Sequence, residues 1–151
     1  MYIIYFIKGG IYMFGDNGIF GKSYHTMDDK NRIILPKNTN REENDELGFY
    51  KENELTFRIY NLKTLKKQIE DYRKGQLSDI EKIDQIINDL TMRIIATGNV
   101  DSSGRTAIPK QIVEEYNLGK RLIFHGGENH LKIFKDEETY NEYVNSVQKR
   151  K

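Results

Sequence analysis

The sequence predicts an α+β fold built from two similar units in tandem. One motif occurs twice with the same internal spacing, and each copy is followed by a run of alternating apolar residues. A repeat of fixed spacing indicates that the fold contains two copies of one structural unit. Apolar residues at helical spacing, between the copies and after the second one, add helices to both units.

The repeated motif ends at the only two prolines of the chain. Residues 28–37 are DDKNRIILPK and residues 101–110 are DSSGRTAIPK, so both contain Asp, three residues, Arg, two residues, Leu or Ile, Pro and Lys. Asp first and Gly fourth is typical of a type I turn, and the Asn in the first copy tolerates the same positive φ. We therefore expect each copy to form a turn that closes a β-hairpin. The turn-organising residues are Asp28, Asn31, Asp101 and Gly104.

A strand is expected after each turn, and a helix is expected after the second proline. Leu55, Phe57 and Ile59 alternate with polar residues in the first copy, as half-buried strands do. Proline is well tolerated in the first turn of a helix. After Pro109, an apolar face predicts such a helix, with Gly119 as its end.

The stretch after Pro36 has no apolar stripe, and Asn31 replaces a glycine. We therefore expect the second copy to be the more regular one. The pattern divides the chain into an amino-terminal extension (1–12), a first unit (18–64), a helical linker (65–91), a second unit (94–138) and a carboxyl-terminal helix with a basic tail (139–151).

The composition limits the possible functions. The 151 residues include no cysteine, which excludes disulfides and thiolate metal sites and fits a reducing cytoplasm. The net charge is only +1, so any attraction to nucleic acid has to be local. The apolar run at residues 1–7 is far shorter than the roughly 20 residues that span a bilayer, and we expect no membrane association.

Catalytic chemistry is poorly represented. No phosphate loop, nucleophile elbow or zinc motif occurs, and we expect no cofactor, no metal, no catalytic residue and no small-molecule substrate. One alternative remains open, an enzyme or metal protein that uses His125 and His130. Their spacing is weak evidence because a third ligand is missing.

The duplicated Asp-x-x-x-Arg motif predicts DNA binding. Two such units side by side would present Arg32 and Arg105 on one face, and a paired β element can enter the major groove. Arginine binds guanine O6 and N7 there in bidentate fashion. The structural alternative is that each Asp only caps its turn and pairs with its own Arg. The residues expected to contact phosphates are Lys30, Lys37, Ser102, Ser103 and Lys110.

Segments 24–32 and 98–109 resemble the MraZ family of bacterial transcriptional regulators, within the SpoVT/AbrB class of swapped-hairpin proteins. The resemblance implies a pseudo-two-fold swapped-hairpin β-barrel flanked by helices, and a homo-oligomeric ring on the nucleoid. It further implies repression of the division and cell-wall gene cluster through direct repeats in double-stranded DNA. Because members of the family tend to begin after residues 1–12, it also implies Met13 as an alternative start. Carried over to this chain, Arg32 and Arg105 would contact bases, while Asp28 and Asp101 would hold the turns.

A second alternative is an AbrB-type antitoxin or interaction module that pairs with a toxin. Such proteins commonly neutralise their partner with a flexible tail. Residues 136–148 instead have the spacing of an ordered amphipathic helix.

Overall fold

The computed structural model describes residues 21–36, 41–75, 80–127 and 130–149. In these ranges the chain forms eight strands and four helices, which confirms the α+β class. The predicted extension at 1–12 and Lys37 lie outside the described residues. The first half consists of β1 (Gly21–Thr26), β2 (Arg32–Ile34), β3 (Glu46–Lys51), β4 (Phe57–Asn61) and α2 (Leu62–Gly75). The second half consists of α3 (Ile80–Arg93), β5 (Ile94–Asn99), β6 (Arg105–Ala107), α4 (Lys110–Glu115), β7 (Arg121–Gly126), β8 (Leu131–Phe134) and α5 (Glu137–Lys149).

Six strands form one antiparallel sheet in the order β1-β7-β8-β4-β3-β5, and β2 pairs with β6 in a separate two-stranded ribbon. The two halves exchange strands, because β1 joins β7 of the second half and β5 joins β3 of the first. The central pairs are Ile33 with Thr106 and Phe57 with Ile133, which join equivalent positions of the two copies. A pseudo-two-fold relation therefore runs through both sheets.

The expectation that each turn closes a β-hairpin is wrong. In each copy the turn joins strands of different sheets. Two backbone hydrogen bonds close the turn, from Asp28 N to Arg32 O and from Asn31 N to Asp28 O in the first copy and at the equivalent residues in the second, and the flanking strands are not paired beyond them in the described residues. The strands on either side of the turn pair elsewhere because β1 finds a longer partner in β7 than β2 could provide. All six residues of β1 pair with β7, whereas β2 offers only three residues and pairs with β6.

The main core lies between the large sheet, the ribbon and α4. Phe49, Phe57 and Phe124 are completely buried in it, together with Ile33 from the ribbon and Ile112 from α4. Ile33 is buried while its neighbours in β2 are not, so the ribbon has an inner and an outer face. Burial of these large side chains fixes the ribbon against the sheet.

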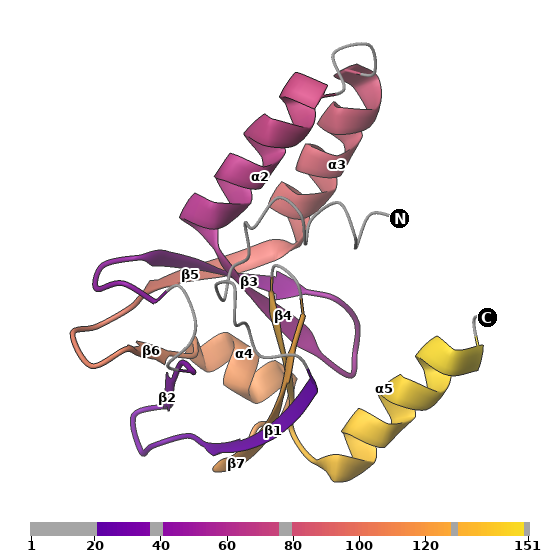
Figure 1. The fold of residues 1–151 in the computed structure, drawn as a ribbon. Coiled ribbons are helices and arrows are strands. Elements are labelled where there is room, and N and C mark those ends of the chain that lie inside the picture. The colour runs from indigo at the N-terminus through magenta and orange to yellow at the C-terminus, as the bar shows by residue number, and fades with distance from the viewer. Residues whose placement is uncertain (1–20, 37–40, 76–79, 128–129, 150–151) are drawn as a thin grey trace.

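Helices α2 and α3 occupy the predicted linker and project side by side from the end of the sheet near β3 and β5 (Figure 1). Leu65 packs with Tyr50 and Tyr60 at their base, and α2 ends at Gly75. Helix α5 forms where the amphipathic pattern of residues 136–148 predicted a helix, and it lies against β8. No helix in the described ranges has the length and apolar character needed to cross a membrane.

The segments after the two prolines differ from each other. Pro109 precedes α4, and its carbonyl accepts the amides of Ile112 and Val113. The expected end at Gly119 is wrong, because α4 ends at Glu115 and Asn117 supplies the positive φ of 50°. After Pro36, the described residues 41–45 form a turn and no helix.

Candidate nucleic-acid interface

The two motif copies form turns of the same geometry. The amide of Asn31 donates to the carbonyl of Asp28 at 3.0 Å, and that of Gly104 donates to the carbonyl of Asp101 at 3.0 Å. Both closing residues have a left-handed backbone, with φ of 60° and 76°. The expectation that the first copy is less regular is therefore wrong for the turn.

In each turn the aspartate organises its own arginine. One carboxylate oxygen of Asp28 accepts the amides of Lys30 and Arg32, at 2.9 and 2.8 Å, and the other accepts Arg32 Nε at 2.7 Å. Asp101 accepts the amides of Ser103 and Arg105 at 2.8 and 2.9 Å, and Arg105 Nε at 3.0 Å.

These contacts also set the charge of the two carboxyl groups. The backbone hydrogen bond from Arg32 lowers the pKa of Asp28, with the Arg32 guanidinium adding to the effect. The pKa of Asp101 is lowered in the same way by the backbone and guanidinium of Arg105. Both aspartates are therefore ionised at neutral pH and hold their arginines by charge-assisted hydrogen bonds.

The ribbon joins the two turns into one surface. Leu35 N donates to Gly104 O at 2.9 Å, and Ile108 N donates to Asn31 O at 2.8 Å, so each turn is bonded to the strand of the other copy. In the ribbon, Arg32 pairs with Ala107 and Ile34 pairs with Arg105. Directly paired residues share a face, as do residues two apart in one strand. The outer face of the ribbon consists of Arg32, Ile34, Arg105 and Ala107.

The two arginines present the same chemical group to solvent. Their side chains are 30% and 33% exposed. Within the described part of the chain, the Nε atoms of Arg32 and Arg105 are bonded to the aspartates, and no hydrogen bond of their terminal nitrogens is seen. A guanidinium held in this way keeps donors available for a planar acceptor pair such as a carboxylate, a phosphate or a guanine edge.

The other predicted DNA-binding residues lie at different places. Lys30, Ser102 and Ser103 are exposed in the two turns, next to the arginines. Lys110 is the first residue of α4, beyond the ribbon, and its amine lies 4.0 Å from the Glu114 carboxylate. The structure thus brings together two arginines, one lysine and two serines, and leaves Lys110 outside this group.

Arg41 is a cation at this surface that the sequence pattern did not identify. Its Nη1 donates to the carbonyl of Leu35 at 2.9 Å and to that of Gly104 at 3.4 Å. A Cβ on Gly104 would lie 2.0 Å from that nitrogen, so the guanidinium rests directly against the glycine. No local pattern points to Arg41, because its contact is with a turn far along the chain.

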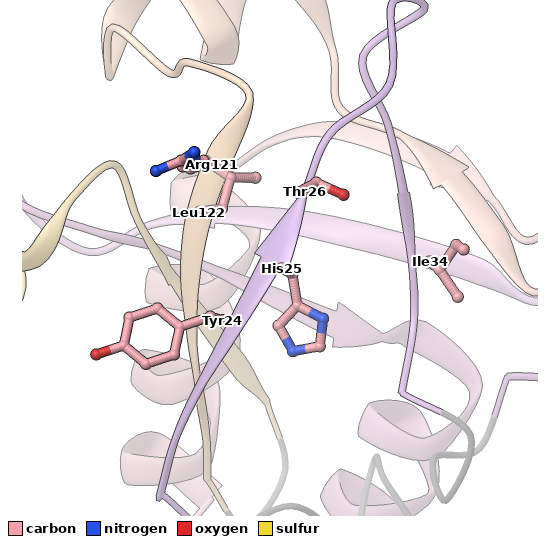
Figure 2. Close-up of a pocket in the computed structure, with 6 residues that line it drawn as sticks. All are labelled: Tyr24, His25, Thr26, Ile34, Arg121 and Leu122. Atoms are coloured by element: carbon pink, nitrogen blue, oxygen red, sulfur yellow. The ribbon is translucent and has the colours of Figure 1, made fainter.

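A hollow of about 530 Å³ lies beside the ribbon, between β1, β7 and β2 (Figure 2). Tyr24 and Arg121 lie at one side of it, with Tyr24 69% exposed, and Ile34 lies at the other. His25 lies between them and stacks on Phe124 with a centroid distance of 3.9 Å; its burial lowers its pKa. This flank therefore offers aromatic, apolar and cationic groups.

The other two histidines are engaged within the protein. His125 Nδ1 lies 3.0 Å from the hydroxyl of Tyr140, and His130 Nε2 lies 2.8 Å from Lys132 Nζ. Because a lysine ammonium can only donate, His130 must accept here and is neutral. Among the described residues, no group of three or more His, Cys, Asp or Glu is placed to hold a metal.

Comparison with known proteins gives one consistent result. The chain is 26% identical over 129 residues to the transcriptional regulator MraZ of Mycoplasma mycoides, covering 84% of this chain and 93% of that protein. It is 26% identical over 133 residues to MraZ of Mycoplasma capricolum, covering 87% and 97%. MraZ of Paenarthrobacter aurescens is 28% identical over 123 residues, covering 79% and 81%. No family model matches the chain. These similarities support the MraZ family.

Proposed function

We propose that this protein is a sequence-specific DNA-binding transcriptional regulator whose contact surface is the β2–β6 ribbon with its two turns. The observation that carries the proposal is the pair of aspartate-held arginines, Arg32 and Arg105, on one outer face. A two-stranded β element fits the major groove, where an arginine donates two hydrogen bonds to a guanine. The similarity to transcriptional regulators over most of the chain supports the same proposal.

The roles of the remaining residues follow from the geometry. Lys30, Ser102 and Ser103 flank the arginines and would contact phosphates, which fixes the position of the protein on the duplex. Arg41 would add a phosphate contact next to Gly104, provided that one of its nitrogens turns outward. The aspartates would carry no direct contact, because a carboxylate is repelled by phosphates and these two already accept three hydrogen bonds each within their turns.

Further features of the proposal rest on the resemblance. They are a closed swapped-hairpin barrel, a ring of several copies, nucleoid association in the cytoplasm, and repression of the division and cell-wall gene cluster. A ring would raise the affinity for DNA, which a single chain with a net charge of only +1 attracts weakly. Several ribbons that meet successive DNA repeats would add their modest affinities through a high effective concentration.

The proposal is tested by fluorescence anisotropy with a labelled duplex, taken from the region upstream of the gene that encodes the chain or selected from random sequences. Arg32→Ala and Arg105→Ala should each weaken specific binding by about tenfold or more, the loss of a bidentate guanine contact. The matched control is Arg73→Ala, an exposed arginine on α2, with unchanged affinity expected. The log of the binding constant should fall with log salt by about 0.9 for each phosphate contacted.

Two outcomes would contradict base recognition by the ribbon. If no duplex sequence is preferred over bulk DNA, or if the two ribbon variants bind as the native chain does, the ribbon does not recognise bases. The arginines would then serve only to hold their turns.

A further inference from the structure

The outer face of the ribbon carries an apolar side chain that the core does not use. Ile34 is 58% exposed, although its neighbour Ile33 is completely buried. It is paired directly with Arg105 across the ribbon, so the two side chains stand next to each other on the same face. Ile34 is therefore an exposed apolar side chain between two arginines, on the surface proposed to contact DNA.

The equivalent position in the second copy is different. Ala107 replaces Ile34 by the internal symmetry of the motif, and it pairs with Arg32. The two halves of the ribbon therefore have the same arginine but unequal apolar neighbours. The difference is three carbon atoms of side chain, on the surface proposed to enter the groove.

We propose that Ile34 contacts the 5-methyl group of a thymine beside the guanine bound by Arg105, and that the two halves of the DNA site are recognised unequally for this reason. The inference rests on the proposed function and deepens it. In the major groove, the thymine methyl is the apolar group that distinguishes one base, and apolar side chains contact it.

The spacing of the two groups fits this contact. Paired side chains in a ribbon have Cβ atoms about 4.5–5.5 Å apart, and successive bases on one strand are about 3.4 Å apart along the helix axis. A side chain directly beside Arg105 therefore reaches the base next to that guanine or one step further. Ala107, which is three carbon atoms shorter, would bury less of a thymine methyl beside Arg32.

The test replaces thymine by deoxyuridine, which removes the methyl group and leaves the base pairing intact. The full-length chain first selects a duplex from random sequences, and each thymine of that duplex is then replaced singly. Dissociation constants are measured by anisotropy for the native chain, for Ile34→Ala and for Ile86→Ala. The last variant is a matched control, because Ile86 is an exposed isoleucine on α3, far from the ribbon in sequence.

The expected result is a loss of about fourfold for the native chain at one thymine next to a recognised guanine, the effect of returning one methyl group to water. Ile86→Ala should show the same loss. Ile34→Ala should bind the thymine and deoxyuridine duplexes equally.

Three results would overturn the inference. They are a selected site without thymine near the guanine contacted by Arg105, a deoxyuridine series in which no position matters, and a methyl effect that persists in Ile34→Ala. In each case, binding that still depends on Arg105 would leave the proposed function standing. If no sequence is selected at all, the proposed function fails and the thymine contact fails with it. A change in oligomeric state for Ile34→Ala, without a methyl effect, would assign Ile34 to a contact between copies instead.

Discussion

Asn31 and Gly104 occupy the same position of the two turns, and both have the left-handed backbone that closes the turn next to an arginine, with φ of 60° and 76°. The carbonyl of Asn31 accepts the amide of Ile108, and the carbonyl of Gly104 accepts the amide of Leu35, so each turn is bonded to the other copy. The surroundings differ, however. Gly104 is buried under the guanidinium of Arg41, and a Cβ there would collide with Arg41 Nη1.

We expect Gly104→Ala to lower the free energy of unfolding by about 1–2 kcal/mol, the cost of a left-handed backbone for a residue with a Cβ. Arg41 would also have to move from the Leu35 carbonyl, but it sits at the end of a flexible chain and adds little. Asn31→Gly should change the free energy by less than about 0.5 kcal/mol, because both residues tolerate this conformation. Urea unfolding measures both values.

The control for this pair is Gly119→Ala. Gly119 has no positive φ, and a Cβ there would meet no atom within 4 Å, so alanine should be neutral or should stabilise the protein by up to about 1 kcal/mol. Equal losses at Gly104 and Gly119 would contradict the conformational argument.

A second prediction concerns Asp101, which holds Arg105 without contacting DNA in the proposed complex. Asp101→Asn removes a negative charge, so nonspecific DNA binding should become tighter by simple electrostatics. Specific binding should become weaker relative to it, by about tenfold, since Arg105 loses its anionic partner. The measured quantity is the ratio of dissociation constants for the selected duplex and for a scrambled duplex.

Asp84→Asn on α3 makes the same change of charge away from the ribbon. Its specificity ratio should equal that of the native chain. A ratio for Asp101→Asn that also equals the native value would show that Arg105 does not depend on Asp101 for its position.

The turns could be predicted from sequence because their information is local. Asp, Gly or Asn at fixed positions specifies the backbone of a turn within four residues, and both turns form as expected. The interpretation of each Asp–Arg pair as structural and the interpretation as DNA-binding turn out to be compatible. The aspartate uses only Nε of the arginine, so the same contact that holds the side chain leaves its outer donors available.

The partners of the strands could not be predicted in this way. The strand at 21–26 has the same local pattern whether it pairs with the next strand or with β7, and its pairing with β7 joins residues far apart in the chain. The outward position of Ile34 depends on the register between β2 and β6, which joins residues far apart in the chain. The contact of Arg41 with Gly104 has the same long-range origin.

A third prediction concerns Glu52, which joins three elements on the other side of the sheet. Its carboxylate accepts Arg58 Nε at 2.6 Å, Lys132 Nζ at 2.9 Å and the Tyr143 hydroxyl of α5 at 2.5 Å. Glu52 and Lys132 are each only 13% exposed. Burial tends to raise the pKa of Glu52, but the bond from Tyr143 and the charge of Lys132 outweigh it, and the pKa is lowered.

Glu52→Gln keeps the shape of the side chain and removes the charge, which leaves two largely buried cations without an anionic partner. We expect a loss of about 3 kcal/mol in the free energy of unfolding. Asp84→Asn breaks an ion pair whose two side chains are more than half exposed, and it should cost less than about 1 kcal/mol. Urea unfolding measures the free energy of unfolding of both variants. Similar losses of this free energy would show that the Glu52 cluster is no stronger than a surface ion pair.

The last prediction is a loss of stability at mildly acidic pH. Burial, with the charges of Lys132 and Arg58, holds the pKa of His130 well below the ordinary imidazole value of about 6.5, and burial also lowers the pKa of His25 and His125. Below pH 6.5 the unfolded chain therefore binds protons that the folded protein does not bind, so the free energy of unfolding falls as the pH falls. Urea unfolding between pH 8 and pH 5 should show a plateau above about pH 7 and a decline below it. His130→Gln keeps an acceptor for Lys132 and cannot titrate, so its decline should be shallower; a slope equal to that of the native chain would show that His130 is protonated in the folded protein.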